Sequence, residues 1–428
     1  MLLNRTRANE IMDRYGLDGM VAAFKENIYY LSDYWGPMFL MSRNYTLYAL
    51  LPRDETAPAA LVMPGSGVYH LEHKPTWMPN IATYITRLKP GQPMPPRDFE
   101  MTTEEIDETG PMPTPPAHTP LMPYPTRQGV AMAPRDEQLL ARYAAHGSDN
   151  PQVTSTRALA GAIREAGLEQ GRLGFDDPRV LGWLQDVGLE KLSGVDALNI
   201  FKQIRMVKSP DEIELLKVAG RMSETAIEAV IAAIKPGMPL DEIGRIHAMS
   251  MAEQGGKSEW IIANIRGLAT GVVERDEIMK LDSVGSWKEY RGDVGRSVIC
   301  GEPTREMLDR NKAVTRALHI AYENIRPGKT FKEIVDLTLK AVHDEGFPGF
   351  VLAAPHSVGL EHTDHPVSVG AEMPGHHELR FLENMVFTLD MPYHEFGWGT
   401  THVEDMMIVR AHGCEPITSM DTTLRVKA

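Results

Sequence analysis

Four acidic side chains and one histidine in the second half of this 428-residue chain have types and placements suited to metal chemistry. Asp282 and Asp293 lie in IMKLDSVGSWKEYRGDVGRSVICG, which we expect to fold as two strands joined by a turn. Such a hairpin brings the carboxylates together, where they repel each other unless they are protonated or neutralised by cations. This segment alone is weak support for a site, because solvated turn residues also form acid pairs.

The other three residues follow later in the chain. His356 precedes a glycine-containing turn in PHSVGLEHTDHP, Asp390 ends the apolar run MVFTLD, and Glu404 lies in THVEDMMIV. An acid at the end of an apolar strand needs a compensating charge. One imidazole with four carboxylates suits Mn²⁺, Co²⁺, Fe²⁺ or Zn²⁺, and four acids balance two such ions. Two ions about 3.5–4 Å apart can hold a hydroxide between them and polarise a carbonyl.

An internal duplication predicts the elements that position these residues. The stretches 225–255 and 316–346 each contain a helix, a Pro-Gly pair and a second helix that ends at a glycine. A Pro-Gly pair stops one helix and sets the angle to the next. We therefore expect two related halves, each a helix pair followed by strands, whose two sheets form one site.

A helix start near residue 209 marks the beginning of this duplicated region. Ser209 is an N-cap candidate, Pro210 stands at the first helical position, and Glu212 completes a capping box. The preceding part contains a predicted strand at 19–24 and a predicted helix at 136–146, which indicates an α/β domain. Eleven of the 31 prolines fall between positions 90 and 125, so we expect a long surface excursion there.

Composition excludes several functional classes. The net charge of -14 argues against nucleic-acid binding, which requires basic patches. The two cysteines, Cys300 and Cys414, provide neither a disulfide framework nor a thiolate zinc site. No apolar run reaches eighteen residues and the N-terminus has no apolar signal region, so we expect a cytoplasmic protein without a membrane span.

The order and spacing of these motifs resemble the pita-bread metallopeptidase family, which includes methionine aminopeptidase, aminopeptidase P, prolidase and creatinase. The similarity extends from Lys202 to the C-terminus, and RMVKSPDEIELLKVA resembles the first helix of this domain in the prolidase and creatinase branch. More loosely, ENIYYLSDY resembles that branch's Asn-Ile-x-Tyr-Leu segment. The resemblance implies an α/β (α+β) chain, with a small α/β domain at 1–200, a duplicated pita-bread catalytic domain at 201–428, and a homodimer.

The same resemblance assigns roles to the five residues. Asp282 matches the family's first aspartate, Asp293 the bridging aspartate, His356 the single histidine ligand and Glu404 the second bridging acid. Asp390 falls where the family has glutamate, so its charge is kept on a shorter side chain. The implied cofactor is a pair of divalent metal ions, with manganese among the candidates.

Two substrate-handling histidines of the family are missing. Thr363 stands seven residues after His356, where the family usually has a histidine, and NIRGLATGVVERDEIMK has no histidine before the first aspartate. His402 shares a strand face with Glu404, and we predict that it is catalytic; a hydrogen-bonded sheet histidine is the alternative.

Four further residues complete the predicted site. His365, close to the histidine ligand, is a second catalytic candidate. Thr363, His362 and Trp35 are predicted to contact substrate, Trp35 because its segment reaches the neighbouring subunit's site in the family's dimers.

The predicted function is metal-dependent hydrolysis of an amide or related C–N bond by a metal-bridging hydroxide. The retained ligands favour an enzyme, and the missing histidines favour a small non-peptide substrate over an Xaa-Pro peptide. The main alternative is a non-hydrolytic lyase acting on a small metabolite on the same fold. A catalytically silent binding protein is the third possibility.

Overall fold

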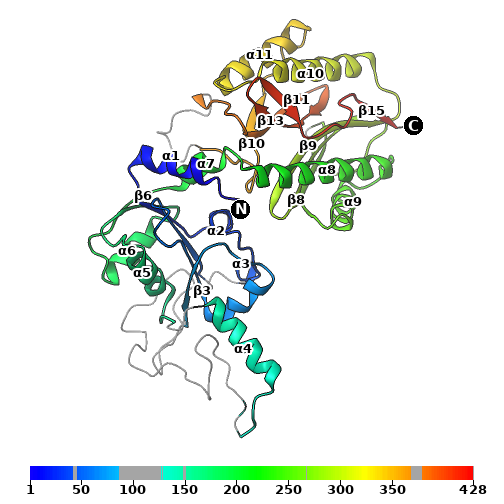
Figure 1. Cartoon of the computed structure of the whole chain (residues 1–428). Coiled ribbons are helices and arrows are strands. Elements are labelled where there is room, and N and C mark those ends of the chain that lie inside the picture. Colours follow the sequence, from blue (N-terminus) through cyan, green and yellow to red (C-terminus); the bar gives the residue numbers. More distant parts are fainter. Residues whose placement is uncertain are drawn as a thin grey trace. The chain divides into compact units, whose positions relative to one another are not determined.

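The structure, a computed structural model, describes residues 1–41, 46–85, 127, 129–147, 151–266, 268–367 and 378–427. The chain folds as two compact units, Met1–Ile204 and Arg205–Ala428 (Figure 1). The proline-rich segment 90–125 lies outside the described residues. Within the described ranges, no helix is both long and apolar enough to cross a membrane.

The first unit is built on a six-stranded mixed sheet with the order β4-β3-β2-β1-β5-β6. The strand predicted at 19–24 is confirmed as β1, which pairs antiparallel with β2 and parallel with β5. Buried aliphatic side chains of the sheet and of α5 form its core. Its elements are α1 (Arg5–Tyr15), β1 (Gly19–Ala22), α2 (Lys25–Ser32), α3 (Met38–Met41), β2 (Tyr48–Pro52), β3 (Ala60–Pro64), η1 (Gly65–Glu72), β4 (Asn80–Tyr84), α4 (Pro134–His146), α5 (Ser155–Glu165), β5 (Arg172–Phe175), α6 (Arg179–Asp186), β6 (Ser193–Asp196) and α7 (Leu198–Arg205).

The second unit repeats one plan twice. In each half a pair of helices precedes a group of antiparallel strands, and the strands form sheets with the orders β15-β9-β8-β7 and β10-β11-β13-β14, with β12 paired to β11. The first half contains α8 (Pro210–Ala233), α9 (Leu240–Glu253), β7 (Lys257–Ile265), β8 (Ile278–Trp287) and β9 (Tyr290–Cys300). The second half contains α10 (Arg305–Asn324), α11 (Phe331–Asp344), β10 (Ala354–Ser357), β11 (Val386–Glu395), β12 (Gly399–Val403), β13 (Met406–Arg410), β14 (Gly413–Pro416) and β15 (Arg425–Lys427).

The predicted duplication is confirmed down to its glycines. Gly237 and Gly328, which follow the matching prolines, have φ of 81° and 92°, and Gly255 and Gly346 have φ of 82° and 95°. Only glycine enters this region without strain, so the four residues fix equivalent turns in the two halves. The capping box that starts α8 at Ser209 is also present as predicted.

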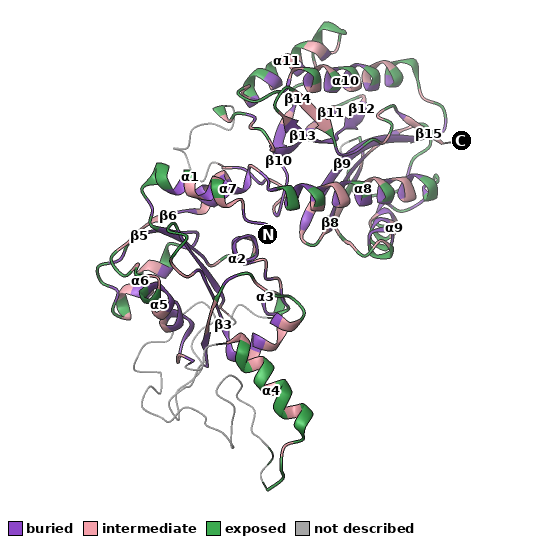
Figure 2. Ribbon diagram, in the orientation of Figure 1, coloured by how far each residue is buried: buried purple, intermediate pink, exposed green. Residues whose placement is uncertain are grey.

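The two sheets are joined where the backbones of Gly295 and Glu404 meet. The Gly295 N–H donates to the Glu404 carbonyl at 3.1 Å, and the Glu404 N–H donates back at 3.0 Å. The buried Arg296 guanidinium donates to both carbonyls at 2.7 Å and to the Asp405 carboxylate at 2.6 Å. Figure 2 shows these strands as buried, with the outward faces of α8, α10 and α11 exposed. The join between the two halves therefore contains buried charged side chains.

A second buried ion cluster holds the turn after β10. Arg205 donates to Asp364 Oδ1 at 2.6 Å and Lys208 to Asp364 Oδ2 at 2.9 Å, and all three side chains are almost fully buried. Although burial alone would raise it, the two cations hold the pKa of Asp364 well below its usual range. A Cβ on Gly359 would overlap this carboxylate, so the close approach depends on glycine there.

We predict that Asp364→Ala lowers the free energy of unfolding by about 3–5 kcal/mol, because it removes the buried carboxylate that Lys208 and Arg205 share and leaves Arg205 dependent on the more exposed Glu361. In the wild type, the depressed pKa means that this stabilisation is present above about pH 4 and is lost as the pH falls through the folded-state value. Urea denaturation across this pH range measures both effects. Asp344→Ala, at an exposed ion pair with Lys340, is the control and should cost less than about 1 kcal/mol. Equal losses in the two variants would contradict the prediction.

Candidate metal centre

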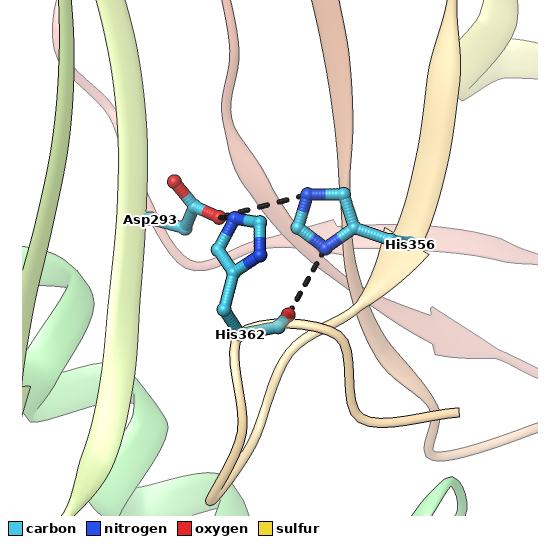
Figure 3. A group of neighbouring side chains, drawn as sticks. All are labelled: Asp293, His356 and His362. Carbon is cyan, nitrogen blue, oxygen red and sulfur yellow. Dashed lines mark hydrogen bonds and ion pairs between the residues drawn. The ribbon is translucent and has the colours of Figure 1, made fainter. Parts of the chain in front are cut away.

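One group of facing ligand atoms lies between β9 and the turn after β10. The Asp293 Oδ2 is 3.1 Å from the His362 Nε2 and 3.7 Å from the His356 Nε2 (Figure 3). The His356 Nδ1 lies 3.1 Å from the carbonyl oxygen of His362, which can only accept a hydrogen bond. Nδ1 therefore carries the proton, and the lone pair of Nε2 points toward the carboxylate, as in a metal-ligating histidine.

A second group contains Asp282, Asp390, His402 and Glu404, whose ligand atoms all lie within 4.8 Å of one another. The His402 Nδ1 is 3.4 Å from the Asp390 Oδ1, and its Nε2 is 3.2 Å from the Glu404 Oε2. The other Glu404 oxygen, Oε1, is 3.7 Å from the His356 Nε2 and accepts a hydrogen bond from the Thr388 hydroxyl at 2.8 Å. Glu404 thus faces both groups, one with each oxygen.

Strand register brings these residues onto one surface. In the β8–β9 hairpin Asp282 pairs with Gly295, and Asp293 pairs with Val284. The two aspartates are therefore diagonal neighbours on the same face, as the predicted hairpin requires. Asp390 enters from β11, and Glu404 follows β12 directly.

Several ligand-type atoms are buried without a hydrogen-bond partner among the described residues. They are both carboxylate oxygens of Asp293, Oδ1 of Asp390, Nε2 of His356 and Nδ1 of His402. Burial and the nearby Glu404 carboxylate raise the pKa of Asp293 well above its usual range, and the same two causes raise that of Asp390 to about 6. Buried polar atoms normally have partners. These residues therefore fit a pair of divalent cations, which would satisfy the orphaned atoms and balance the carboxylates.

Comparison with known proteins shows what the part of the chain around this centre is similar to. Residues 214–411, which contain all these side chains, match metallopeptidase family M24. The match covers a little under half of the chain. The M24 match spans both halves of the second unit and ends at the residue after β13.

Relatives of known structure share the whole architecture. The chain is 24% identical over 237 residues to an Xaa-Pro dipeptidase of Pyrococcus furiosus, a match that covers 53% of this chain and 67% of that protein. An Xaa-Pro dipeptidase from Bacillus anthracis superposes with a TM-score of 0.70 at 19% identity, covering 99% and 98% of the two chains. An X-Pro aminopeptidase from Thermotoga maritima gives 0.64 at 19% identity, covering 99% of each. The predicted fold, an α/β N-terminal domain followed by a pita-bread domain, is confirmed.

Of the predicted catalytic and substrate-binding residues, some lie in the two ligand groups and others do not. His362 and His402 lie in the two ligand groups, and the Thr363 hydroxyl is 3.4 Å from the His362 Nδ1. His365 belongs to neither group: its Nδ1 accepts the Ser357 N–H at 3.0 Å, and its ring stands edge-on to that of Phe331. These contacts hold the strand and turn together, and they offer no support for the catalytic role predicted for His365.

Trp35 belongs to the first unit. Its half-buried ring packs against Tyr29 and Phe39, with ring centroids 5.3 Å and 5.1 Å away. Its role in substrate binding stays a prediction.

A lysine that the sequence analysis did not single out also reaches the centre. The Lys280 Nζ is 2.9 Å from the Asp282 Oδ2, and both side chains are largely buried. Burial opposes the charge, but Asp282 and Asp390 together raise the pKa of Lys280. Strand alternation could have found it, because residues 280 and 282 of one strand share a face.

We predict that Lys280→Met strengthens divalent-metal binding by the second group about tenfold or more, because an ammonium beside Asp282 both occupies a ligand oxygen and repels a cation. Isothermal titration of the metal-free protein with Zn²⁺ measures this. Lys332→Met, at an exposed ion pair with Asp336 on α11, is the control and should leave the affinity unchanged. Unchanged or weaker binding in Lys280→Met would show that the ammonium does not compete with the metal.

Proposed function

We propose that this chain is a metal-dependent hydrolase that cleaves an amide or related C–N bond in a small substrate or short peptide. The observation that carries the proposal is the pair of ligand groups, with buried oxygens and nitrogens that no described residue satisfies. The match of residues 214–411 to metallopeptidase family M24 and the similarity to Xaa-Pro dipeptidases support it. Two divalent ions, when bound, supply a hydroxide nucleophile at neutral pH and polarise the substrate carbonyl.

The residues of the chain divide this work between them. Asp293 and His356 would hold one ion and Asp282 and Asp390 the other, with Glu404 facing both. Asp293, which the family resemblance implies as a bridging ligand, is thus assigned here to the first ion, because it groups with His356 and His362. The hydrogen bond from His356 Nδ1 to the His362 carbonyl fixes the ring so that Nε2 is presented to the ion. The Thr388 hydroxyl does the same for one oxygen of Glu404.

Metal content provides the first test. We predict that Glu404→Gln lowers the metal bound by both groups, because its two oxygens face different groups, while Asp293→Asn chiefly lowers that of the first. Elemental analysis after dialysis against metal-free buffer counts the ions. Asp336→Asn, at an exposed ion pair with Lys332 on α11, is the control and should keep the wild-type metal content. Wild-type metal content in both Glu404→Gln and Asp293→Asn would refute the site.

Substrate class provides the second test. The family's substrate-contacting histidine is replaced by Thr363, and each such donor is typically worth about 2.7–4 kcal/mol. We therefore predict a kcat/KM for Xaa-Pro dipeptides below about 10⁴ M⁻¹s⁻¹ and faster turnover of a small amide. A panel of Xaa-Pro dipeptides and small amides, assayed with Mn²⁺, Co²⁺ or Zn²⁺, measures this, and efficient Xaa-Pro cleavage would contradict it. With ¹⁸O-labelled water, hydrolysis puts the label into the product, whereas a lyase leaves the product unlabelled.

A further inference from the structure

We propose that His362 and His402 are themselves metal ligands, one for each ion, so that the centre holds three imidazoles where the family resemblance implies only His356. The inference deepens the proposed function and rests on it. It assigns His362 and His402, predicted from the sequence as a substrate contact and a catalytic residue, to the metal ions instead.

His362 repeats the arrangement of His356. Its Nε2 is 3.1 Å from the Asp293 Oδ2, and its Nδ1 lies 3.4 Å from the Thr363 hydroxyl. In both histidines Nδ1 therefore faces an oxygen of the turn after β10. Nε2 of both rings faces the Asp293 carboxylate (Figure 3). The Trp260 ring packs edge-on against His362 at 5.2 Å and limits the positions open to the imidazole. The side chain is held where a ligand to the first ion is needed.

His402 is fully buried, and its backbone is fixed on both sides by one hydroxyl. Its N–H donates to the Ser297 Oγ at 2.7 Å, and the same hydroxyl donates to its carbonyl at 3.0 Å. The two ring nitrogens face carboxylate oxygens of Asp390 and Glu404. A neutral imidazole has a single N–H, so only one of these contacts can be a hydrogen bond. In the other contact, the lone pair of the unprotonated nitrogen faces a carboxylate oxygen and is repelled by it. A cation held by the second group would remove this repulsion, because both atoms could bind it.

The surroundings make room for this ring. A Cβ on Gly295 would overlap the His402 Nε2 and would come within 2.9 Å of the Glu404 Cβ. Asp390 is one methylene shorter than the glutamate that the family resemblance implies at this position, and its Oδ1 already lies 3.4 Å from the His402 Nδ1. The glycine and the short acid thus accommodate an imidazole between the carboxylates of the second group.

Three imidazoles change the metal preference. Imidazole suits Zn²⁺, Fe²⁺, Ni²⁺ and Cu²⁺, whereas carboxylate and water suit Mn²⁺ and Mg²⁺. With a nitrogen ligand from His362 on the first ion and one from His402 on the second, the centre should prefer Zn²⁺ over Mn²⁺ at both positions.

X-ray absorption at the zinc edge of the full-length, Zn²⁺-loaded protein tests the assignment directly. We expect scattering from three imidazoles shared between two zinc ions. His362→Gln and His402→Gln should each remove one imidazole and weaken Zn²⁺ binding at the affected ion at least about tenfold. The Mn²⁺ affinity should change less, so the ratio of Zn²⁺ to Mn²⁺ affinity should fall. A general loss of stability would weaken the binding of both ions and leave this ratio unchanged.

Two histidines of the second unit serve as matched controls. His343→Gln alters an exposed residue of α11 whose Nε2 lies 2.7 Å from the Phe350 carbonyl oxygen, and His394→Gln alters a partly buried residue on β11. Both should keep the wild-type spectrum and Zn²⁺ affinity. If His402→Gln does not fold, the wild-type spectrum decides by itself.

A single imidazole shared by the two zinc ions would overturn the proposal, as would variants that keep the Zn²⁺ affinity and metal preference of the controls. If the wild-type spectrum shows two imidazoles, the assignment is wrong for whichever of His362 and His402 can be replaced without a change in the spectrum. Failure of the proposed function gives a different result. A wild-type protein that binds neither Zn²⁺ nor Mn²⁺ would show that the chain has no metal centre.

Discussion

The paired backbone hydrogen bonds between Gly295 and Glu404 are the constraint on which the second unit depends. These hydrogen bonds join the sheets of the two halves. They also fix the positions of the candidate ligands that lie close to Gly295 and Glu404 in the sequence. Asp293 and His402 each lie two residues before this join, so strand alternation turns both toward the same space. Arg296 ties both carbonyls and Asp405 into the join, and a shift of either sheet would break several buried hydrogen bonds at once.

The same arrangement concentrates charge that the fold by itself does not balance. Acids from three different segments are buried within a few ångströms of one another, and the raised pKa values of Asp293 and Asp390 record the cost. The contrast with Asp364 is informative. That carboxylate is equally buried, but Arg205 and Lys208 compensate it, and its pKa is lowered. A buried carboxylate therefore indicates the metal centre where resident cations do not balance the charge, as at Asp293 and Asp390, whereas Lys280 is paired with Asp282.

Much of this could be predicted from the sequence, because it depends on local rules. Pro-Gly pairs, the capping box at Ser209 and the acids that interrupt apolar strands are all visible in the chain, whereas the roles of the five ligand candidates rest on the family resemblance. The contributions of His362 and Lys280 were harder to predict. The path of the turn after β10 depends on the close approach of Asp364 to Gly359, a tertiary contact that spacing does not encode. Lys280 falls outside the pattern of acids and histidines that indicates metal ligands.

The overlap between a Cβ at position 295 and the His402 ring has a consequence for how this sequence can vary. A chain with any side chain at 295 cannot hold an imidazole at 402 in the present position, whereas a glycine at 295 is compatible with smaller residues at 402. The two positions are therefore epistatic in one direction. A sequence can therefore take the histidine at 402 only when position 295 is already glycine, and a sequence that keeps this histidine cannot accept a side chain at 295.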